Sequence, residues 1–140
     1  MNIKDIEVKM PDTFPHDRLG TIFTRQLELM EKYHDIESKN NPHMCKEVPV
    51  DIQSYAGQNR LKDFAWRITE EIGEAMSCLK NKPWKATPME TDVDHYKEEI
   101  ADAFHFFIEL CILSGIGAHE LFQLYFKKAE VNKFRQRSGY

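Results

Sequence analysis

The sequence predicts an all-α fold with four helices, and three observations support this prediction. Four segments carry apolar residues at spacings of three, four and seven, which is the period of an amphipathic helix. No segment of useful length alternates apolar and polar residues as a half-buried strand does. With 140 residues, of which 41% are hydrophobic and 30% charged, the chain has the size and composition of one globular domain. We therefore expect one bundle-like domain over residues 1–140, with residues 1–16 as an N-terminal extension.

The first helix is expected to run from about Asp17 to about Lys39. Asp17 is a suitable N-cap, because its carboxylate can accept hydrogen bonds from the unpaired N–H groups of the first turn. Apolar residues then recur at helical spacings and predict the buried stripe, which consists of Leu19, Ile22, Leu29, Tyr33 and Ile36. Gln26 falls inside this stripe. A buried amide needs a hydrogen-bond partner, so Gln26 is expected to contact either a ligand or a neighbouring helix.

The second helix is expected from about Ser54 to Lys80, after a polar, loop-like segment that ends near Asp51. Its apolar face is regular and consists of Leu61, Phe64, Ala65, Ile68, Ile72, Ala75, Met76 and Leu79. Trp66 is expected either in the core or in an interface between subunits. Two prolines, Pro83 and Pro88, then prevent the helix from continuing, because proline lacks the backbone N–H that a helix needs.

The third helix is expected to begin at TDVD, where Thr91 and Asp94 have the spacing of a capping box, and to end near Gly115. Its middle, IADAFHFFIELCILSG, is apolar nearly all round, which is typical of a helix at the centre of a bundle. The fourth helix is expected to begin near Ala118, and it carries Leu121, Leu124 and Tyr125 on one face.

Two acidic pairs stand on consecutive predicted helices, at the edge of the apolar stripes: Glu71 with Glu74, and Glu99 with Asp102. Residues three apart in a helix project from the same side, so each pair can direct both carboxylates to one place. Four carboxylates at a helix interface repel one another unless protons or cations neutralise them. Oxygen ligands without cysteine or paired histidine favour Mg²⁺ or Mn²⁺ over zinc. The pattern predicts a magnesium site, in which Mn²⁺ can substitute, with Glu70 and Glu98 around it.

Two other interpretations of the acidic residues remain open. A single Glu-x-x-Glu is usually a solvated helix face, and a helical binding module without chemistry would leave all four acids in that role. The occurrence of two pairs on consecutive helices favours the metal site. A di-iron carboxylate bundle also uses inward-facing acids, but it requires Glu-x-x-His from each of two helices. This chain has only Asp102-x-x-His105, and His105 is expected to be a hydrogen-bonded core residue.

The fourth helix continues its apolar stripe with cationic and amide side chains, Lys128, Asn132 and Arg135. Such side chains donate hydrogen bonds to phosphate oxygens. A metal beside these donors is a common way of holding a polyphosphate, so the three residues are expected to bind phosphate groups. The alternative is that basic residues near a helix C-terminus only interact favourably with the helix dipole.

Composition excludes several classes of function. A net charge of −4 argues against a general nucleic-acid-binding protein, which usually has a strongly basic surface. Three cysteines without a Cys-x-x-Cys pair indicate neither a disulfide framework nor a zinc–thiolate site. No apolar run approaches the roughly 20 residues of a membrane span, and the first residues lack the pattern of a secretion signal. A cytoplasmic location is therefore expected, without nucleic-acid or membrane partners.

Three segments together resemble the all-α NTP pyrophosphatase (MazG-like) superfamily: EEIGEA, EEIADAFHFF and LYFKKAEVNKFRQRSGY. The signature of that superfamily is E-x-x-E followed, after a linker, by E-x-x-D. The resemblance is closest to the branch of dimeric dUTPases and phage dCTPase/dUTPase enzymes. The C-terminal pattern of this branch is matched by Tyr125, Lys128, Asn132, Arg135, Gln136, Gly139 and Tyr140. The resemblance covers residues 17–140.

The resemblance implies a hydrolase that converts a nucleoside triphosphate and water to the monophosphate and pyrophosphate. It implies two or more Mg²⁺ ions, held by Glu71, Glu74, Glu99 and Asp102. Glu71 and Glu74 are the expected catalytic residues, with Glu71 as the base that takes a proton from a bound water. A homodimer or homotetramer that controls a nucleotide pool is implied as well, in the host cytoplasm if the chain is phage-encoded.

Two positions depart from the pattern of that branch. Ala129 replaces an asparagine after the helix lysine, and Glu109 stands where relatives carry Asn or Ser. A carboxylate there can accept paired hydrogen bonds from guanine or one from the cytosine amino group, but only one from uracil N3–H. The resemblance favours dUTP or dCTP as substrate, with dGTP as the alternative. Gln26, Trp84 and Glu109 are the expected base or sugar contacts. A structural ion pair for Glu109, and a loop-pinning role for Trp84, are the alternatives.

Overall fold

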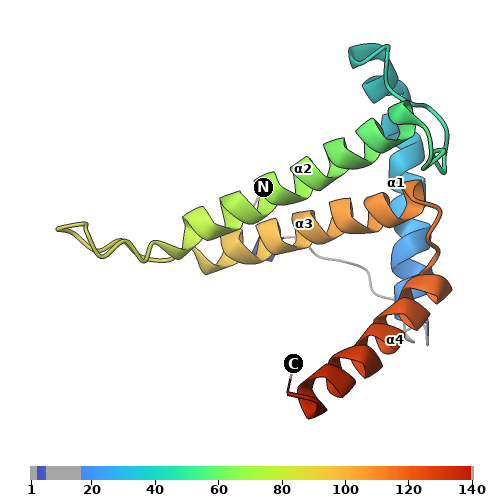
Figure 1. Ribbon diagram of the computed structural model, residues 1–140. Coiled ribbons are helices and arrows are strands. Elements are labelled where there is room, and N and C mark those ends of the chain that lie inside the picture. Colours follow the sequence, from blue (N-terminus) through green and yellow to red (C-terminus); the bar gives the residue numbers. More distant parts are fainter. Residues whose placement is uncertain (1–2, 6–16, 140) are drawn as a thin grey trace.

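The computed structural model describes residues 3–5 and 17–139, which form four long helices with no strand among them (Figure 1). The helices are α1 (Arg18–Asn40), α2 (Tyr55–Leu79), α3 (Val93–Leu113) and α4 (Ala118–Arg137), preceded by one 3-10 turn, η1 (Ile3–Asp5). The predicted all-α class is confirmed, and each helix lies close to its predicted position. Most of the predicted N-terminal extension and the terminal Tyr140 lie outside the described residues.

Aspartate side chains cap two of the helices. Asp17 caps α1 as predicted, through an oxygen that accepts a first-turn N–H at 2.7 Å. The predicted capping box at Thr91 is wrong. Asp92 caps α3 instead, because its Oδ1 accepts from the His95 N–H at 3.0 Å. The Thr91 hydroxyl donates to the Leu79 carbonyl, so Thr91 ties the end of the loop back to the end of α2.

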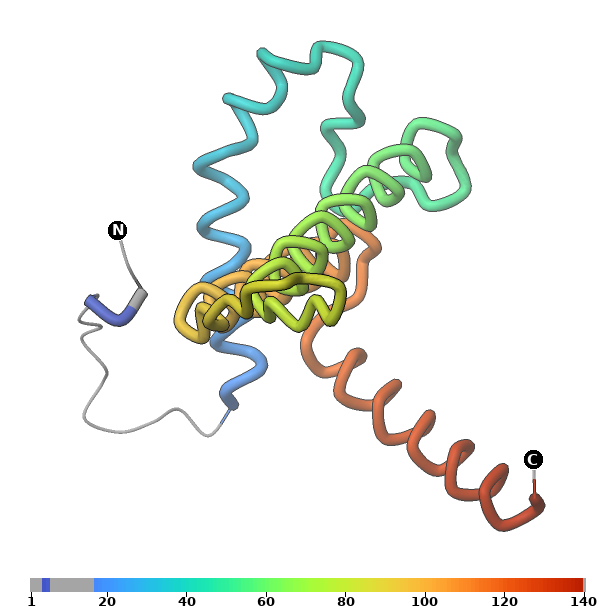
Figure 2. Tube along the Cα trace, turned by 90° about the vertical axis from the view of Figure 1, so that its left-hand side faces the viewer, coloured from blue at the N-terminus to red at the C-terminus, as the bar shows by residue number. Residues whose placement is uncertain are grey.

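Helices α2 and α3 lie side by side and run in opposite directions, and α1 crosses them near the start of α2 and the end of α3 (Figures 1 and 2). The hydrophobic core lies at this crossing. Its largest fully buried side chains are Phe64, Ile108 and Leu113. Phe64 also meets Phe106 edge-on, with ring centres 6.1 Å apart. The ends of α2 and α3 that lie beyond α1 are held mainly by each other.

The stripe of α1 that faces the core differs from the predicted one. Phe23, Gln26 and Met30 are buried, whereas four of the predicted residues are 37–53% exposed: Ile22, Leu29, Tyr33 and Ile36. The two stripes are adjacent on the helix and share Gln26, which is buried as expected and whose partners come from α3. Periodicity selects the stripe with more apolar residues, so it selected the wrong one here. The exposed stripe leaves apolar side chains accessible along α1, and two of them, Leu29 and Tyr33, line a cavity together with residues of α2 and α3.

Helix α4 extends away from α2 and α3 in both views of the fold (Figures 1 and 2). Its first turn joins the core, where Ala118 and Leu121 pack against a cluster that contains Phe23 and Ile108. No residue of α4 is buried, and it exposes Phe122, Leu124, Tyr125, Phe126, Val131 and Phe134. Helix α3 also exposes large apolar side chains, so its expected burial on all sides is not reached within one chain: Ile100, Phe104 and Phe107.

Within the described residues, no single helix combines the length and the apolarity of a membrane span. Helices α3 and α4 pass that test only when they are counted together, and they are bent by 104° at the short break between them. Gly115 lies in this break with a φ of 76°, a left-handed conformation that glycine adopts without steric strain.

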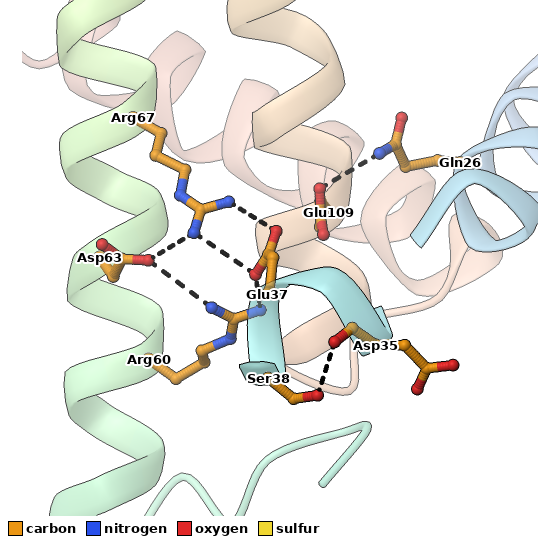
Figure 3. A network of polar contacts seen from close by, with 8 residues as sticks. All are labelled: Gln26, Asp35, Glu37, Ser38, Arg60, Asp63, Arg67 and Glu109. Carbon is orange, nitrogen blue, oxygen red and sulfur yellow. Dashed lines mark hydrogen bonds and ion pairs between the residues drawn. The ribbon is translucent and has the colours of Figure 1, made fainter. Parts of the chain in front are cut away.

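A network of ion pairs joins the end of α1 to α2 (Figure 3). Glu37 accepts hydrogen bonds from Arg60 at 2.5 Å and from Arg67 at 3.0 Å, and Arg67 also donates to Asp63 at 2.9 Å. The Arg67 guanidinium lies over the Phe64 ring, 4.2 Å from its centre. Burial raises the pKa of Glu37, but hydrogen bonds from Arg67 and Arg60 outweigh burial and hold this pKa below its ordinary value of 4.5. No local spacing indicates the network, because Glu37 is 23 and 30 residues from the two arginines.

Replacing Glu37 with glutamine is expected to lower the free energy of unfolding by about 3 kcal/mol, because two arginines at the helix interface lose their carboxylate partner. Urea denaturation followed by circular dichroism measures this change. Since the pKa of Glu37 is lowered in the fold, its stabilisation is present above pH 4.5 and is lost as the pH falls through the lowered value.

The matched control for this variant is Glu28→Gln, which breaks an exposed pair with Arg25 on the same helix. It is expected to change the free energy of unfolding by less than about 0.5 kcal/mol. Equal stability of the two variants would show that the network contributes no more than a surface ion pair.

Candidate metal centre and adjoining cavity

Three carboxylates from two helices meet at the α2–α3 interface. Glu71 on α2 and Glu99 and Asp102 on α3 each offer one oxygen, and these oxygens lie within 4.8 Å of one another. The antiparallel packing of the two helices and the three-residue spacing of Glu99 and Asp102 produce this meeting. Glu74 is exposed one turn further along α2. Its negative charge still helps to raise the pKa of Glu71. The structure therefore gathers three of the predicted ligands and leaves the fourth at the edge.

Glu99 is the most deeply buried member of this cluster, with 6% of its surface exposed. Its Oε1 lies 2.5 Å from Nε2 of His95, one turn earlier on α3. Its Oε2 is also buried, and no donor among the described residues reaches it. Burial raises the pKa of Glu99, but hydrogen bonds with Glu71 and His95 outweigh burial and lower it overall. His95 was not predicted, although its four-residue spacing from Glu99 is a signal of such a contact.

Crowding raises the pKa of the two other carboxyls. Burial, a hydrogen bond with Glu99 and the neighbouring negative charges raise the pKa of Glu71 to about 7. Burial and the charge of Glu99 raise the pKa of Asp102. Near neutral pH the cluster therefore shares a proton that a divalent cation would displace. The donors fit Mg²⁺ or Mn²⁺, because they are all carboxylate oxygens and Oε2 of Glu99 has no other partner.

The affinity for Mn²⁺ or Mg²⁺ is expected to rise about tenfold for each pH unit up to about pH 7 and then to level off. The reason is that Glu71, whose pKa is raised to about 7, must lose its proton to the solvent when the metal binds. Isothermal titration of Mn²⁺ into the protein at a series of pH values measures the affinity. An affinity that stays constant between about pH 5.5 and pH 7 would contradict metal binding at this cluster.

A cavity of about 440 Å³ adjoins the acidic cluster, and Glu71 and Asp102 form part of its wall. Helices α1, α2 and α3 supply the remaining wall: Gln26, Leu29, Met30, Tyr33, Glu37, Arg67, His105, Phe106 and Glu109. Glu109 lies seven residues beyond Asp102 on α3, which corresponds to about 10 Å along the helix axis. A second cavity of about 380 Å³ shares Met30, Glu37 and Glu109 with the first. An elongated ligand that is bound at the acids can therefore extend along α3 to Glu109.

Gln26 and Glu109, two of the predicted base contacts, are buried and bonded to each other. Gln26 Nε2 donates to Glu109 Oε2 at 3.3 Å, and Gln26 Oε1 lies 2.8 Å from Nδ1 of His105. Gln26 was expected to contact either a ligand or a neighbouring helix, and in the structure its partners lie on the neighbouring helix α3. Glu109 forms no ion pair among the described residues, so the structural ion pair considered as its alternative role is not observed. His105 is exposed on the cavity wall, and its expected place in the core is wrong.

The other predicted site residues lie apart from the acids within one chain. The three predicted phosphate ligands are exposed on α4 and do not line the cavity beside the acids: Lys128, Asn132 and Arg135. Trp84 is 75% exposed in the loop between α2 and α3, and Trp66 is 68% exposed rather than in the core. Glu70 is exposed, whereas Glu98 is half-buried and its charge helps to raise the pKa of Asp102. The phosphate and base contacts of α4 and Trp84 stay predictions.

Comparison with known proteins finds relatives in two bacteriophages. The chain is 35% identical to a dCTP pyrophosphatase of Enterobacteria phage LZ5 and 33% identical to a dCTP pyrophosphatase of Enterobacteria phage T4. Each match covers 49% of this chain and 46% of the relative, so the chain matches about half the length of these curated relatives. No family model matches the chain, and no solved structure matches it. The chain is thus similar to dNTP pyrophosphatases, while its place in the MazG-like superfamily stays a prediction.

Proposed function

We propose that the chain is a Mg²⁺-dependent pyrophosphohydrolase that converts a deoxynucleoside triphosphate to the monophosphate and pyrophosphate, with dCTP preferred. The observation that carries this proposal is the meeting of Glu71, Glu99 and Asp102 within 4.8 Å, beside a cavity of about 440 Å³. That volume lies in the range of pockets that bind small molecules. The names of the two phage relatives support both the reaction and the base.

The carboxylates would act together at the α-phosphorus of the substrate. Glu71, Glu99 and Asp102 would hold the metal, with Glu74 on the outer side of the same site. Bound Mg²⁺ neutralises phosphate charge and lowers the pKa of a coordinated water. Glu71 takes a proton from the attacking water, the water oxygen bonds to the α-phosphorus, and the bond from phosphorus to the bridging oxygen breaks to release pyrophosphate. His95 orients Glu99 for this role through its 2.5 Å contact.

A second copy of the chain would supply the contacts that one chain lacks. Helix α4 has no buried residue and exposes six large apolar side chains, which is unusual for a helix that functions alone. Arg67, the arginine that lines the cavity, is already bonded to Glu37 and Asp63. We infer that α4 of the partner subunit brings its copies of Lys128 and Asn132 to the β- and γ-phosphates. The proposed assembly is a homodimer or a pair of such dimers.

Release of pyrophosphate from a panel of dCTP, dUTP, dGTP, dATP and dTTP tests the proposal. Hydrolysis is expected in Mg²⁺ and Mn²⁺, with dCTP as the best substrate, and it is expected to stop when EDTA removes the metal. A preference for dGTP would favour the alternative reading of Glu109, whose carboxylate can accept two hydrogen bonds from guanine. Nucleotide binding without any pyrophosphate release would instead identify a binding module.

A further inference from the structure

Glu109 occupies a distinctive position, because it lies on the wall shared by both cavities. Only 9% of its surface is exposed. Gln26 donates to its Oε2 at 3.3 Å, and no hydrogen bond from the described residues reaches its other oxygen, Oε1. Figure 3 shows Glu109 between Gln26 and the ion pairs of Glu37. A buried carboxylate that has an unused acceptor oxygen and borders a cavity is suited to bind a donor of a ligand.

The arginines beside Glu109 do not neutralise it. Arg60 and Arg67 donate to Glu37, and neither forms an ion pair with Glu109. The other ionisable groups that line the two cavities come from all three helices and the segment after α1: Glu31, Tyr33, His34, Asp35, Cys45, Lys46, Glu71, Asp102 and His105. Burial first, and then the charge of Glu37, raise the pKa of Glu109 to about 7, while the two arginines and Gln26 oppose this rise. Glu109 can therefore be charged or neutral near physiological pH.

The hydrogen bonds of Gln26 determine which of its atoms faces Glu109. The amide oxygen lies 2.8 Å from Nδ1 of His105, which donates to it when this nitrogen carries the proton, and the amide nitrogen then faces the carboxylate. This arrangement suits a charged Glu109, which can only accept hydrogen bonds. A second acceptor site on the same carboxylate remains for a ligand. The preferred ligand group is consequently an N–H or O–H donor.

A nucleotide held at the acidic cluster would present the far edge of its base to Glu109. The two sites are separated by about 10 Å along α3, with the α-phosphate at the acids. The C4 substituent of a pyrimidine projects from the edge remote from the sugar, and it is an amino donor in cytosine but a carbonyl acceptor in uracil. Resting on the proposed function, we propose that Glu109 is the specificity-determining residue that selects cytosine over uracil by accepting a hydrogen bond from the C4 amino group.

This selection depends on the charge of Glu109. At the C4 position a carboxylate accepts from the cytosine amino group, whereas it repels O4 of uracil and can pair with uracil only if the base shifts to present N3–H. A neutral carboxyl has an O–H that can donate to O4, so protonation removes the discrimination. Since the group is ionised above its raised pKa, the preference for dCTP over dUTP is stronger at pH 8 than at pH 6, on either side of the value of about 7.

The experiment measures kcat/KM for pyrophosphate release from dCTP and from dUTP, and compares the ratio of the two constants. The ratio cancels changes in the chemistry that both substrates share, including protonation of the acidic cluster. In Glu109→Gln the dCTP:dUTP ratio is expected to fall at least about tenfold, with dUTP hydrolysis retained, because the amide can donate to O4. Glu90→Gln, in the exposed loop before α3, is the control and is expected to keep the wild-type ratio.

The wild-type protein supplies a second measurement that requires no variant. Its dCTP:dUTP ratio is expected to rise about tenfold from pH 6 to pH 8, and the ratio of Glu109→Gln is expected to stay flat. A ratio that is unchanged by the substitution and by pH, in a protein that hydrolyses dNTPs, would overturn this inference alone. A preference of the wild-type protein for dGTP would also overturn it. Absence of pyrophosphate release from every dNTP would overturn the proposed function together with it.

Discussion

Glu71→Gln and Asp102→Asn are each expected to lower kcat/KM for pyrophosphate release from dCTP by about 10³-fold. Both substitutions keep the size of the side chain and remove a negative charge from a cluster whose oxygens lie within 4.8 Å of one another. A divalent cation held there loses a ligand in either variant. Glu71→Gln also removes the proposed base, which would take the proton from water. A coupled assay for pyrophosphate, with circular dichroism to confirm folding, measures the effect.

The two variants differ in their response to added metal. Excess Mg²⁺ is expected to raise the kcat/KM of Asp102→Asn by about tenfold, because a weakened metal site can still be filled. The amide oxygen of the asparagine remains as a ligand. Excess Mg²⁺ is expected to leave Glu71→Gln inactive, since no metal concentration replaces the missing base. Glu74→Gln should lose only about tenfold in activity, because Glu74 is exposed at the edge of the cluster.

Glu90→Gln is the control, since it removes one carboxylate from the exposed loop between α2 and α3. It is expected to retain wild-type activity. Wild-type rates in both Glu71→Gln and Asp102→Asn would contradict the assignment of the acids as the catalytic centre. A loss of activity in Glu90→Gln as large as in Glu71→Gln would show that any loss of negative charge impairs the protein.

The helices and the central acids could be predicted because their signals are local. Four amphipathic segments and a capping aspartate at position 17 gave the element boundaries. The three-residue spacing of Glu99 and Asp102 placed both on one face of α3, and the neighbouring helix with Glu71 had to face it. Local spacing is sufficient here because consecutive antiparallel helices pack against each other over most of their length.

Features that depend on contacts between distant segments could not be predicted. Glu37 is bonded to Arg60 and Arg67, which are 23 and 30 residues away in the sequence. Nothing in the local sequence distinguishes these three residues from ordinary surface charges. The burial of Gln26 was predicted, but no pattern within α1 reveals that its partners are His105 and Glu109 of α3. Apolar residues also fail to distinguish a core from an interface between subunits, since both require the same helical spacing.

Helix α4 shows why this last ambiguity matters for the site. Lys128, Asn132 and Arg135 were expected to bind phosphate groups beside the metal, but within one chain the structure directs the helix away from α2 and α3 (Figure 1). The same exposed apolar side chains can be covered by a second copy. Acids and phosphate ligands would then meet between two subunits, and this arrangement has a direct test.

Co-expression of Glu71→Gln with the double variant Lys128→Ala/Asn132→Ala is expected to recover about a quarter of the wild-type activity, although each protein alone is nearly inactive. Random pairing makes about half of the dimers mixed, and each mixed dimer contains one site with intact acids from one subunit and an intact α4 from the other. Different affinity tags on the two chains allow the mixed dimers to be purified, and light scattering measures their mass.

The matched control is co-expression of Glu71→Gln with Asp102→Asn, whose substitutions fall in the same cluster on α2 and α3. No pairing of these chains creates an intact acidic cluster, so no recovery is expected whether α4 acts within its own chain or on its partner. Recovery in the first mixture alone therefore locates the phosphate ligands on the partner subunit. A first mixture as inactive as this control, or a wild-type protein that is monomeric at the assay concentration, would contradict the shared site, because a phosphate ligand in the same chain as the acids cannot be restored by a second copy.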